Sequence, residues 1–197
     1  MLQPDEDAPT GVPPILHSVF AKGPFETCVD CGAGLLDAWT PYAVEKVIRQ
    51  GEVVLEFAIC VDCQIVILRE FSEESIDRIR EYTAGTLNQS DEIDRILEVL
   101  DHQTEDRLGT TTPPTPAPDR CQRCGAQDDA YAREHSIGGI LIGDRLIANV
   151  SSLCGKCSDG LDQVLSQKTR EAHDDFIERN FPGVPAELDL PVGAIGL

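Results

Sequence analysis

Cys28-Val-Asp-Cys31-Gly32 contains the first of four short segments in which two residues separate a pair of cysteines. These segments account for all 8 cysteines of the 197-residue chain. The four pairs are Cys28/Cys31, Cys60/Cys63, Cys121/Cys124 and Cys154/Cys157. Because 28 residues separate the first two pairs and 29 separate the last two, the chain is predicted to consist of two related halves.

Residues next to the cysteines support this repeat. A glycine follows the first pair of each half, at Gly32 and Gly125. An apolar run that is rich in β-formers precedes the second pair of each half, at 53–59 and at 146–153. The same features in the same order favour a duplicated unit over chance placement.

A seven-residue string suggests how the two halves align. Tyr-Ala-x-Glu-x-x-Ile occurs at 42–48 and again at 131–137. On this alignment Glu45 matches Glu134, and we expect both carboxylates to be solvated, as charged side chains on strands usually are.

A proline-rich segment separates the two halves. Residues 110–118 contain four prolines in nine positions, a composition that favours an extended linker. We therefore predict a first domain over 1–109 with a helical extension. A second domain over 119–197 is predicted to end in a long helix and an extended tail.

The local patterns favour a hairpin followed by helices in each half. In the first half, 42–48 and 52–59 are predicted strands, Cys60 and Cys63 open a helix, and Ser72 and Ser90 are predicted to cap two more helices. The second half follows the same plan with a looser hairpin, and a single long helix is predicted after Cys157. The predicted fold class is α+β, with two tandem domains.

The cysteine spacing favours zinc. Zn²⁺ prefers tetrahedral coordination, and cysteines two residues apart can direct both sulfurs at one ion across a tight turn. A glycine after the pair permits the positive φ that such a turn requires. We predict two Zn²⁺ ions per chain. The ligands are Cys28, Cys31, Cys60 and Cys63 for one ion, and Cys121, Cys124, Cys154 and Cys157 for the other.

Other roles for the cysteines are open at this level. A disulfide framework is typical of secreted chains, and the first residues of this sequence do not have the pattern expected of a secretory signal. A thioredoxin-like redox motif requires a βαβ setting, which the pattern does not predict. Iron–sulfur ligation also uses thiolates and stays an alternative to zinc.

Charge and hydropathy narrow the choice of partners. The chain has 35 acidic and 16 basic residues, a formal net charge of −19. Because affinity for a phosphate backbone depends on Lys and Arg, nucleic acid is not an expected partner. The apolar runs are too short to span a bilayer, so we expect no membrane association and a cytoplasmic location where thiols stay reduced.

Each half resembles a treble-clef zinc finger: a Cys-x-x-Cys-Gly knuckle, a β-hairpin, and a second cysteine pair on the first turn of a helix. The second half, through Cys121-Gln-Arg-Cys124-Gly125 and Leu153-Cys-Gly-Lys-Cys157, is distantly similar to the zinc-binding domain of the ClpX-type unfoldase. That family's domain dimerises and docks substrates or adaptors. The likeness covers some forty residues per half and implies fold and metal ligands. The repeated strings also resemble uncharacterised bacterial proteins, which imply no activity.

These observations favour a non-enzymatic zinc protein that acts as an interaction or adaptor module. A zinc ion with four thiolate ligands has no vacant position for water, so no catalytic residues are predicted. A treble-clef nuclease would require clustered histidines, whereas the four histidines are dispersed. They are His17, His102, His135 and His173.

Two further functions stay open. A redox- or metal-responsive sensor can use exposed zinc thiolates, whose oxidation releases the metal. A nucleic-acid-binding zinc ribbon is disfavoured by the net charge. Although Arg120, Arg123 and Lys156 lie beside the second site, we expect them to balance its thiolate charge. The expected partner is a protein, and the chain is expected to form a homodimer or to pair its own halves.

Overall fold

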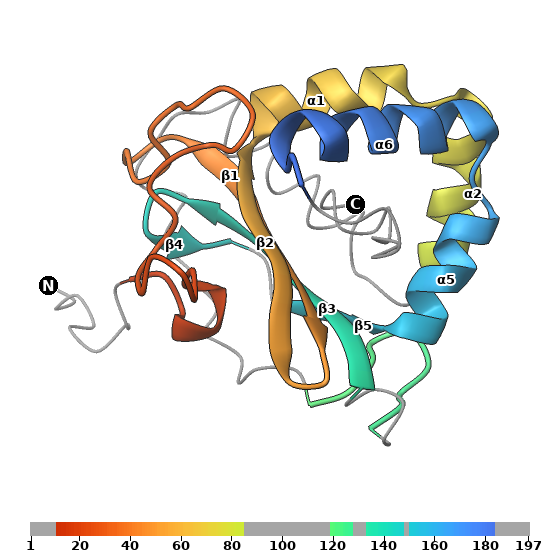
Figure 1. Ribbon diagram of the computed structural model, residues 1–197, viewed down its shortest axis with the longest axis horizontal. Helices are drawn as coiled ribbons and strands as arrows, with labels where there is room; N and C mark the ends of the chain where they lie inside the picture. Colours follow the sequence, from red (N-terminus) through yellow and green to blue (C-terminus); the bar gives the residue numbers. More distant parts are fainter. Residues whose placement is uncertain (1–10, 85–118, 128–132, 148–149, 184–197) are drawn as a thin grey trace, which may run out of the picture.

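The computed structural model describes residues 11–84, 119–127, 133–147 and 150–183 (Figure 1). The helix predicted after Ser90, the linker at 110–118 and the tail from 184 lie outside these residues. The domain boundaries at 109 and 119 therefore stay a prediction.

The first half follows the predicted order of elements. A short 3₁₀ turn, η1 (Pro14–Leu16), precedes two strands and two helices: β1 (Pro41–Arg49), β2 (Glu52–Cys60), α1 (Val61–Glu70) and α2 (Glu73–Thr83). The strands are joined at Gln50 and Gly51, whose φ values of 53° and 82° indicate a type I′ turn. Ser72 caps α2, as predicted, because its side chain accepts a hydrogen bond from the Ser75 N–H.

The described residues of the second half contain two helices where one was predicted. Its elements are β3 (Glu134–Ile142), β4 (Arg145–Leu146), β5 (Ser151–Cys154), α5 (Gly155–Gln163) and α6 (Gln167–Asn180). The prediction of one long helix after Cys157 is wrong because Ser166 starts a new helix. Its backbone is extended, and its side chain accepts a hydrogen bond from the Thr169 N–H.

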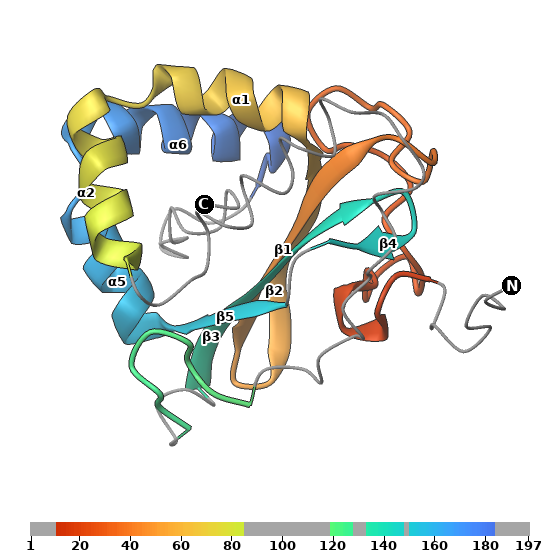
Figure 2. The ribbon, with the colours of Figure 1, turned by 180° about the vertical axis from the view of Figure 1, so that it is seen from behind.

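All five strands belong to one antiparallel sheet. Its order is β2-β1-β3-β4, and β5 also pairs with β3 (Figure 2). The hairpin of the first half therefore joins the strands of the second half edge to edge through β1 and β3. The fold is a mixed α/β structure in which both halves contribute to one sheet.

Strand pairing corrects the alignment of the two halves. Tyr42 pairs with Cys60 in the first half, and His135 pairs with Cys154 in the second, so His135 occupies the place of Tyr42. The alignment on the Tyr-Ala-x-Glu-x-x-Ile string is therefore wrong by four residues. The physical reason is that the cysteines and their hairpins set the register, whereas the matching letters at 131–137 do not occupy equivalent strand positions.

On the corrected alignment, Glu45 and Gly138 are equivalent positions, and they pair with each other across β1 and β3. An approximate two-fold axis thus passes through this pair. The expectation that Glu45 is solvated is wrong, since only 5% of the residue is exposed. A Cβ atom on Gly138 would lie 2.6 Å from Glu45 Oε2, so the glycine makes room for the carboxyl group.

A second contact near the same axis joins the helix caps. Ser72 and Ser166 are equivalent, and their Oγ atoms are 2.9 Å apart. The Ser72 N–H donates to Thr169 Oγ1 at 3.1 Å, and the Ser166 N–H donates to Ser75 Oγ at 2.8 Å. Each half therefore supplies a hydroxyl acceptor to the helix start of the other.

The helices of the two halves pack crosswise. In Figure 1, α1 runs beside α6, and α2 lies beside α5. The Phe57 ring on β2 lies 5.7 Å from Phe176 on α6 and 5.5 Å from Phe181, between ring centroids. Buried side chains of both halves form one hydrophobic core.

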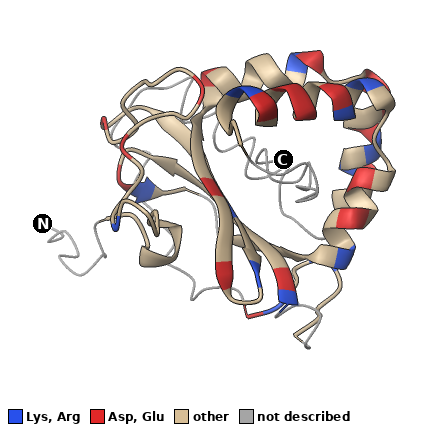
Figure 3. Cartoon of the chain, viewed as in Figure 1, with Lys and Arg blue, Asp and Glu red and all other residues tan. Residues whose placement is uncertain are grey.

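Figure 3 shows acidic and basic residues interspersed along the helices. The charge pattern of the described helices thus offers no continuous basic stripe of the kind that nucleic-acid binding uses.

No helix among the described residues is long and apolar enough to cross a bilayer.

Replacing either cap serine should weaken the crossed helices. We expect Ser72→Ala and Ser166→Ala each to cost about 0.5–2 kcal/mol in the free energy of unfolding. Because the two hydroxyls belong to one cluster, the double variant should lose less than the sum of the single losses. Urea unfolding of the metal-loaded chain measures this. Pairing Ser72→Ala with Ser151→Ala on the sheet is the control and should be additive; additivity of the two cap variants would contradict a shared cluster.

Glu45 should make stability depend on pH. Burial raises the pKa of its carboxyl group well above 4.5, although a hydrogen bond with Ser136 opposes the shift. The protonated form stabilises the fold fully below the unfolded-state pKa, and this contribution is lost as pH rises towards the folded-state pKa. We expect Glu45→Gln to gain stability over the natural chain by up to about 1.4 kcal/mol per pH unit in that window.

Urea unfolding at several pH values between about 6 and 8 measures that gain. Glu134→Gln on the neighbouring strand is the control, because that side chain is 35% exposed and paired with Arg49. A difference between Glu45→Gln and the natural chain that stays constant over this range would show that Glu45 is already ionised in the fold.

Candidate metal centres

The first cysteine quartet joins a loop, a strand end and a helix start. Cys28 and Cys31 lie in the loop before β1, Cys60 ends β2 and caps α1, and Cys63 lies in the first turn of α1. The four Sγ atoms all lie within 4.8 Å of one another. Cys31 Sγ and Cys60 Sγ are 3.7 Å apart.

The second quartet repeats this arrangement. Cys121 and Cys124 precede β3, Cys154 ends β5 and caps α5, and Cys157 lies in the first turn of α5. Its four Sγ atoms also lie within 4.8 Å of one another, and Cys124 Sγ lies 3.7 Å from Cys154 Sγ. The structure thus brings together both sets of residues that the sequence predicted.

Backbone hydrogen bonds shape both knuckles in the same way. The Gly32 N–H donates to Cys28 O at 2.9 Å, and the Gly125 N–H donates to Cys121 O at 2.8 Å. The glycines have φ values of 74° and 72°, which confirms that the turn requires a residue tolerant of positive φ. These turns place the two sulfurs of each pair on one side of the loop.

Each knuckle is also fastened to its own hairpin. The Val29 N–H donates to Ala58 O on β2 at 2.9 Å, and the Gln122 N–H donates to Ser152 O on β5 at 2.9 Å. The strand end that carries the third cysteine is thereby held against the loop that carries the first two. The hairpin is the element that closes each quartet.

The sulfur separations fit one tetrahedral ion. A tetrahedron with metal–sulfur bonds of about 2.3 Å has edges of about 3.8 Å. A disulfide would require sulfurs about 2 Å apart, and all eight cysteines, which lie within the described residues, are free. Each quartet can therefore hold a single metal ion with four protein ligands.

The ionisation of the sulfurs favours a cation. Burial opposes ionisation of Cys28 and Cys121, but backbone N–H groups outweigh it, lowering the pKa of Cys28 and bringing that of Cys121 to about 7. Burial and then the neighbouring sulfurs raise the pKa of Cys63 and Cys157. Four thiolates at this separation repel one another, and a divalent cation relieves that repulsion.

A helix of the second half braces the first knuckle. Asp30, between Cys28 and Cys31, accepts hydrogen bonds at its Oδ1 from Arg179 Nη2 at 2.9 Å and from Asn180 Nδ2 at 3.2 Å. Burial opposes ionisation of Asp30, but these bonds prevail and lower its pKa. The end of α6 is thereby fastened to the first metal centre.

A helix of the first half braces the second knuckle in the equivalent way. The guanidinium of Arg123, which matches Asp30, lies 3.6 Å from the centre of the Tyr82 ring and donates to Tyr82 O. The Tyr82 hydroxyl donates to Cys157 O at 2.9 Å. A Cβ atom on Gly160 would lie 2.3 Å from that hydroxyl, so only glycine fits there.

Sequence reasoning missed these braces. It assigned Arg123 to balancing thiolate charge, placed Tyr82 only on the apolar face of the helix after Ser72, and gave no role to Asp30 or Arg179. One signal was present: the middle of the first cysteine pair carries an acid in one half and a base in the other. Their partners lie 149 and 41 residues away, so spacing alone could not identify them.

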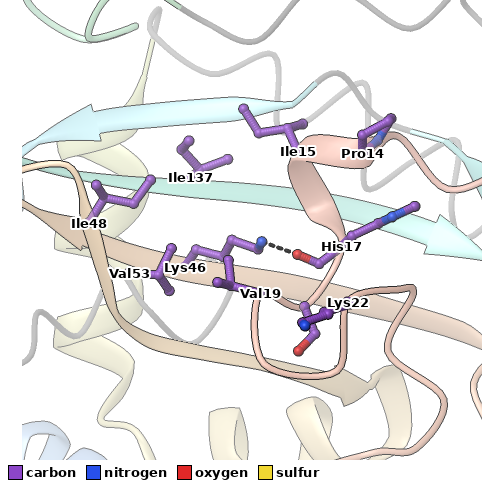
Figure 4. Close-up of a pocket in the computed structure, with 10 residues that line it drawn as sticks. Pro14, Ile15, His17, Val19, Lys22, Lys46, Ile48, Val53 and Ile137 are labelled. Atoms are coloured by element: carbon purple, nitrogen blue, oxygen red, sulfur yellow. Dashed lines mark hydrogen bonds between the residues drawn. The ribbon is translucent and has the colours of Figure 1, made fainter.

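A shallow cleft of about 450 Å³ is a second candidate site (Figure 4). Ile48, Val53 and Ile137 contribute to its apolar lining, and the buried Lys46 reaches it from β1. The Lys46 ammonium donates to His17 O and lies 3.4 Å from Glu56 Oε2. Because Glu56 already neutralises the Lys46 ammonium, the structure gives no reason to assign an anion site to this cleft, one wall of which is the N-terminal loop.

None of the histidines in the described ranges joins a cysteine quartet. Within the described ranges, the two cysteine quartets are the only groups of three or more His, Cys, Asp or Glu side chains placed to share an ion. His17 Nε2 lies 2.8 Å from Val12 O, and His102 lies outside the described residues. The candidate sites therefore consist of thiolates alone.

Removing one ligand should empty one centre. We expect Cys60→Ser to lower the metal content at saturation from about two ions to about one per chain and to reduce the free energy of unfolding. The reason is that metal binding to such a site is folding free energy, about 10–16 kcal/mol for whole zinc sites in peptides. Elemental mass spectrometry and urea unfolding measure the two effects. The exposed neighbour Asp62 offers the control Asp62→Asn, which should change stability by less than about 0.5 kcal/mol. Unchanged metal content in Cys60→Ser would contradict the assignment of Cys60 as a ligand.

Comparison of the chain with protein-family models, with curated protein sequences and with solved structures gave no significant match. The two quartets are compatible with tandem metal sites, and the likeness to the ClpX-type domain stays a resemblance in sequence.

Proposed function

We propose that this protein holds two structural zinc ions, one in each cysteine quartet, in two treble-clef-like units. The observation that carries the proposal is the spacing of the sulfurs: each quartet gathers four of them within 4.8 Å, with one pair at 3.7 Å. Four thiolates with these separations suit Zn²⁺, which has no redox chemistry and no preference beyond the tetrahedron. A single iron ion is the alternative, because it accepts the same ligands.

We further propose that the protein is not an enzyme. Four protein ligands leave a tetrahedral zinc ion no open position at which to activate water. The role of the metal would then be to join the knuckle, the hairpin and the helix of each half. The reducing environment that free thiolates require favours the cytoplasm as its location.

The proposed activity is binding to another protein. Val19 and Phe20, 55% and 76% exposed, stand at the tip of the N-terminal loop. Their N–H groups donate to the carboxylate of the buried Glu56, as does the Ser18 hydroxyl. A loop anchored in this way presents two apolar side chains to solvent, which is typical of interaction sites. The net charge of −19 favours a basic partner over nucleic acid.

One observation favours a sensor as the second candidate. Cys31 and Cys124 are exposed, whereas the other first-pair cysteine of each quartet is buried. An oxidant can therefore reach one ligand in each centre. Release of zinc by mild peroxide, followed by recovery with thiol and fresh zinc, would favour sensing; zinc retained under peroxide would remove this candidate.

Metal analysis tests the zinc proposal directly. Protein purified untagged under reducing conditions should contain about two zinc ions per chain by elemental mass spectrometry. Replacement by Co²⁺ should give the absorption spectrum of tetrahedral thiolate ligation at both sites. Iron in place of zinc would move the proposal to electron transfer, and metal-free protein with blocked thiols would overturn it.

Exposed apolar residues on the N-terminal loop and on α1 allow the two surfaces to be compared as interaction sites. We expect Phe20→Ser to abolish capture of a partner that the natural chain retains, because it removes the most exposed apolar side chain of the loop. Val66→Ser on α1, where the residue is 55% exposed, should leave capture unchanged. Capture that is equal for both variants would rule out the N-terminal loop as the interaction site.

A further inference from the structure

We propose that the two metal centres are energetically coupled, so that a metal ion in one quartet raises the affinity of the other quartet for its ion. The inference rests on the proposed function, because it requires that both quartets bind metal. The coupling would run through α2 and α6. Helix α2 belongs to the first half and ends against the second quartet, whereas α6 belongs to the second half and ends against the first quartet.

The first step is that a metal ion orders its own surroundings. In the first half, it would join the knuckle at Cys28 and Cys31 to the start of α1 at Cys60 and Cys63. The ion would hold together four sulfurs that come from separate elements and all lie within 4.8 Å of one another. Metal binding and local folding are then one process.

Second, α2 connects the ordered start of α1 to the second quartet through side-chain contacts. The Ser72 cap follows α1 directly, and α2 ends at Tyr82 and Thr83. Tyr82 supports the Arg123 guanidinium on its ring and donates its hydroxyl to Cys157 O. A properly placed α1–α2 pair therefore fixes both the knuckle and the helix start of the second quartet.

The third step is the return path through α6. Helix α5 begins at the second quartet, and Ser166 starts α6, whose last turn contains Arg179 and Asn180. These two side chains hold Asp30, the residue between the first two ligands of the first quartet. Order at the second centre thus supports the first, as thermodynamic reciprocity requires.

Fourth, the α1–α2 pair and the α5–α6 pair contact each other at the turn between their two helices. The bends after α1 and after α5 meet in the hydroxyl cluster of Ser72, Ser75, Ser166 and Thr169. Neither helix pair can therefore shift without disturbing the other. The contacts thus connect the first quartet to the second through α1 and α2, and they connect the second quartet back to the first through α5 and α6.

The coupling factor can be measured by Zn²⁺ titration against a competing chelator. Cys28→Ser/Cys31→Ser gives the affinity of the second quartet alone, and Cys121→Ser/Cys124→Ser gives that of the first. The unmutated chain gives the overall constant for binding both ions. For independent sites this constant equals the product of the single affinities. We expect it to exceed that product by roughly 5–150-fold, the range typical of allosteric coupling. Equality within error would overturn the inference.

The ligand variants can fail to fold, so the unmutated chain supplies a second measurement. With one Zn²⁺ ion per chain, native mass spectrometry counts the chains that carry no ion, one ion and two ions. Independent equal sites would leave about half of the chains with one ion. We expect a clearly smaller singly loaded share, which only coupling can produce, because a difference between two independent affinities raises this share above one half. A share of one half or more would overturn a coupling that exceeds the difference between the two affinities.

A brace variant locates the path without touching a ligand. Arg179→Ala removes the bonds to Asp30 and should lower the overall binding constant. Arg80→Ala is the matched control: Arg80 lies in the last turn of α2, its side chain is 75% exposed, and it pairs with Asp77 on its own helix. An equal effect of both variants would overturn the proposed path. A chain that binds fewer than two ions at saturation refutes the zinc proposal, whereas two independent ions refute only the coupling.

Discussion

Four cysteine sulfurs gathered within 4.8 Å, twice in one chain, are the constraint on which the rest of the structure depends. Four thiolates at this separation would repel one another, so each quartet favours a divalent cation. The same constraint explains the local structure. Each knuckle needs a glycine with positive φ, each hairpin must end at a cysteine, and each first helix must start there.

The two halves have equivalent arrangements, but equivalent positions carry different chemistry. Asp30 and Arg123 occupy the same place in the knuckles, and each binds the second helix of the opposite half with its own kind of contact. Glu45 and Gly138 meet at the centre of the sheet, where a second glutamate would have no room. Divergence of this kind lets two copies of one unit fit together in a single arrangement.

The N-terminal segment makes the two halves differ further. Gly139 matches Lys46, and a Cβ atom on Gly139 would lie 2.6 Å from Leu16 Cδ1, so the glycine admits the fully buried Leu16. Lys46 in turn donates to His17 O and pairs with Glu56. Gly139 therefore makes room for the N-terminal segment, whereas Lys46 at the equivalent strand position binds that segment. In the exposed loop that follows, the Val19 N–H donates to Glu56 on β2.

The sequence by itself determined the two cysteine quartets, the hairpin of the first half, the helix starts at the second cysteine pairs and the cap at Ser72. These features depend on spacings of a few residues, which local geometry converts directly into structure. Only the tertiary structure decided the register of the second half, the burial of Glu45 and the crossed packing of helices between the halves. Each of these depends on contacts between residues far apart in the sequence, such as Asp30 and Arg179, which are 149 positions apart. Contacts of this kind produce no periodic pattern in the sequence from which they could be predicted.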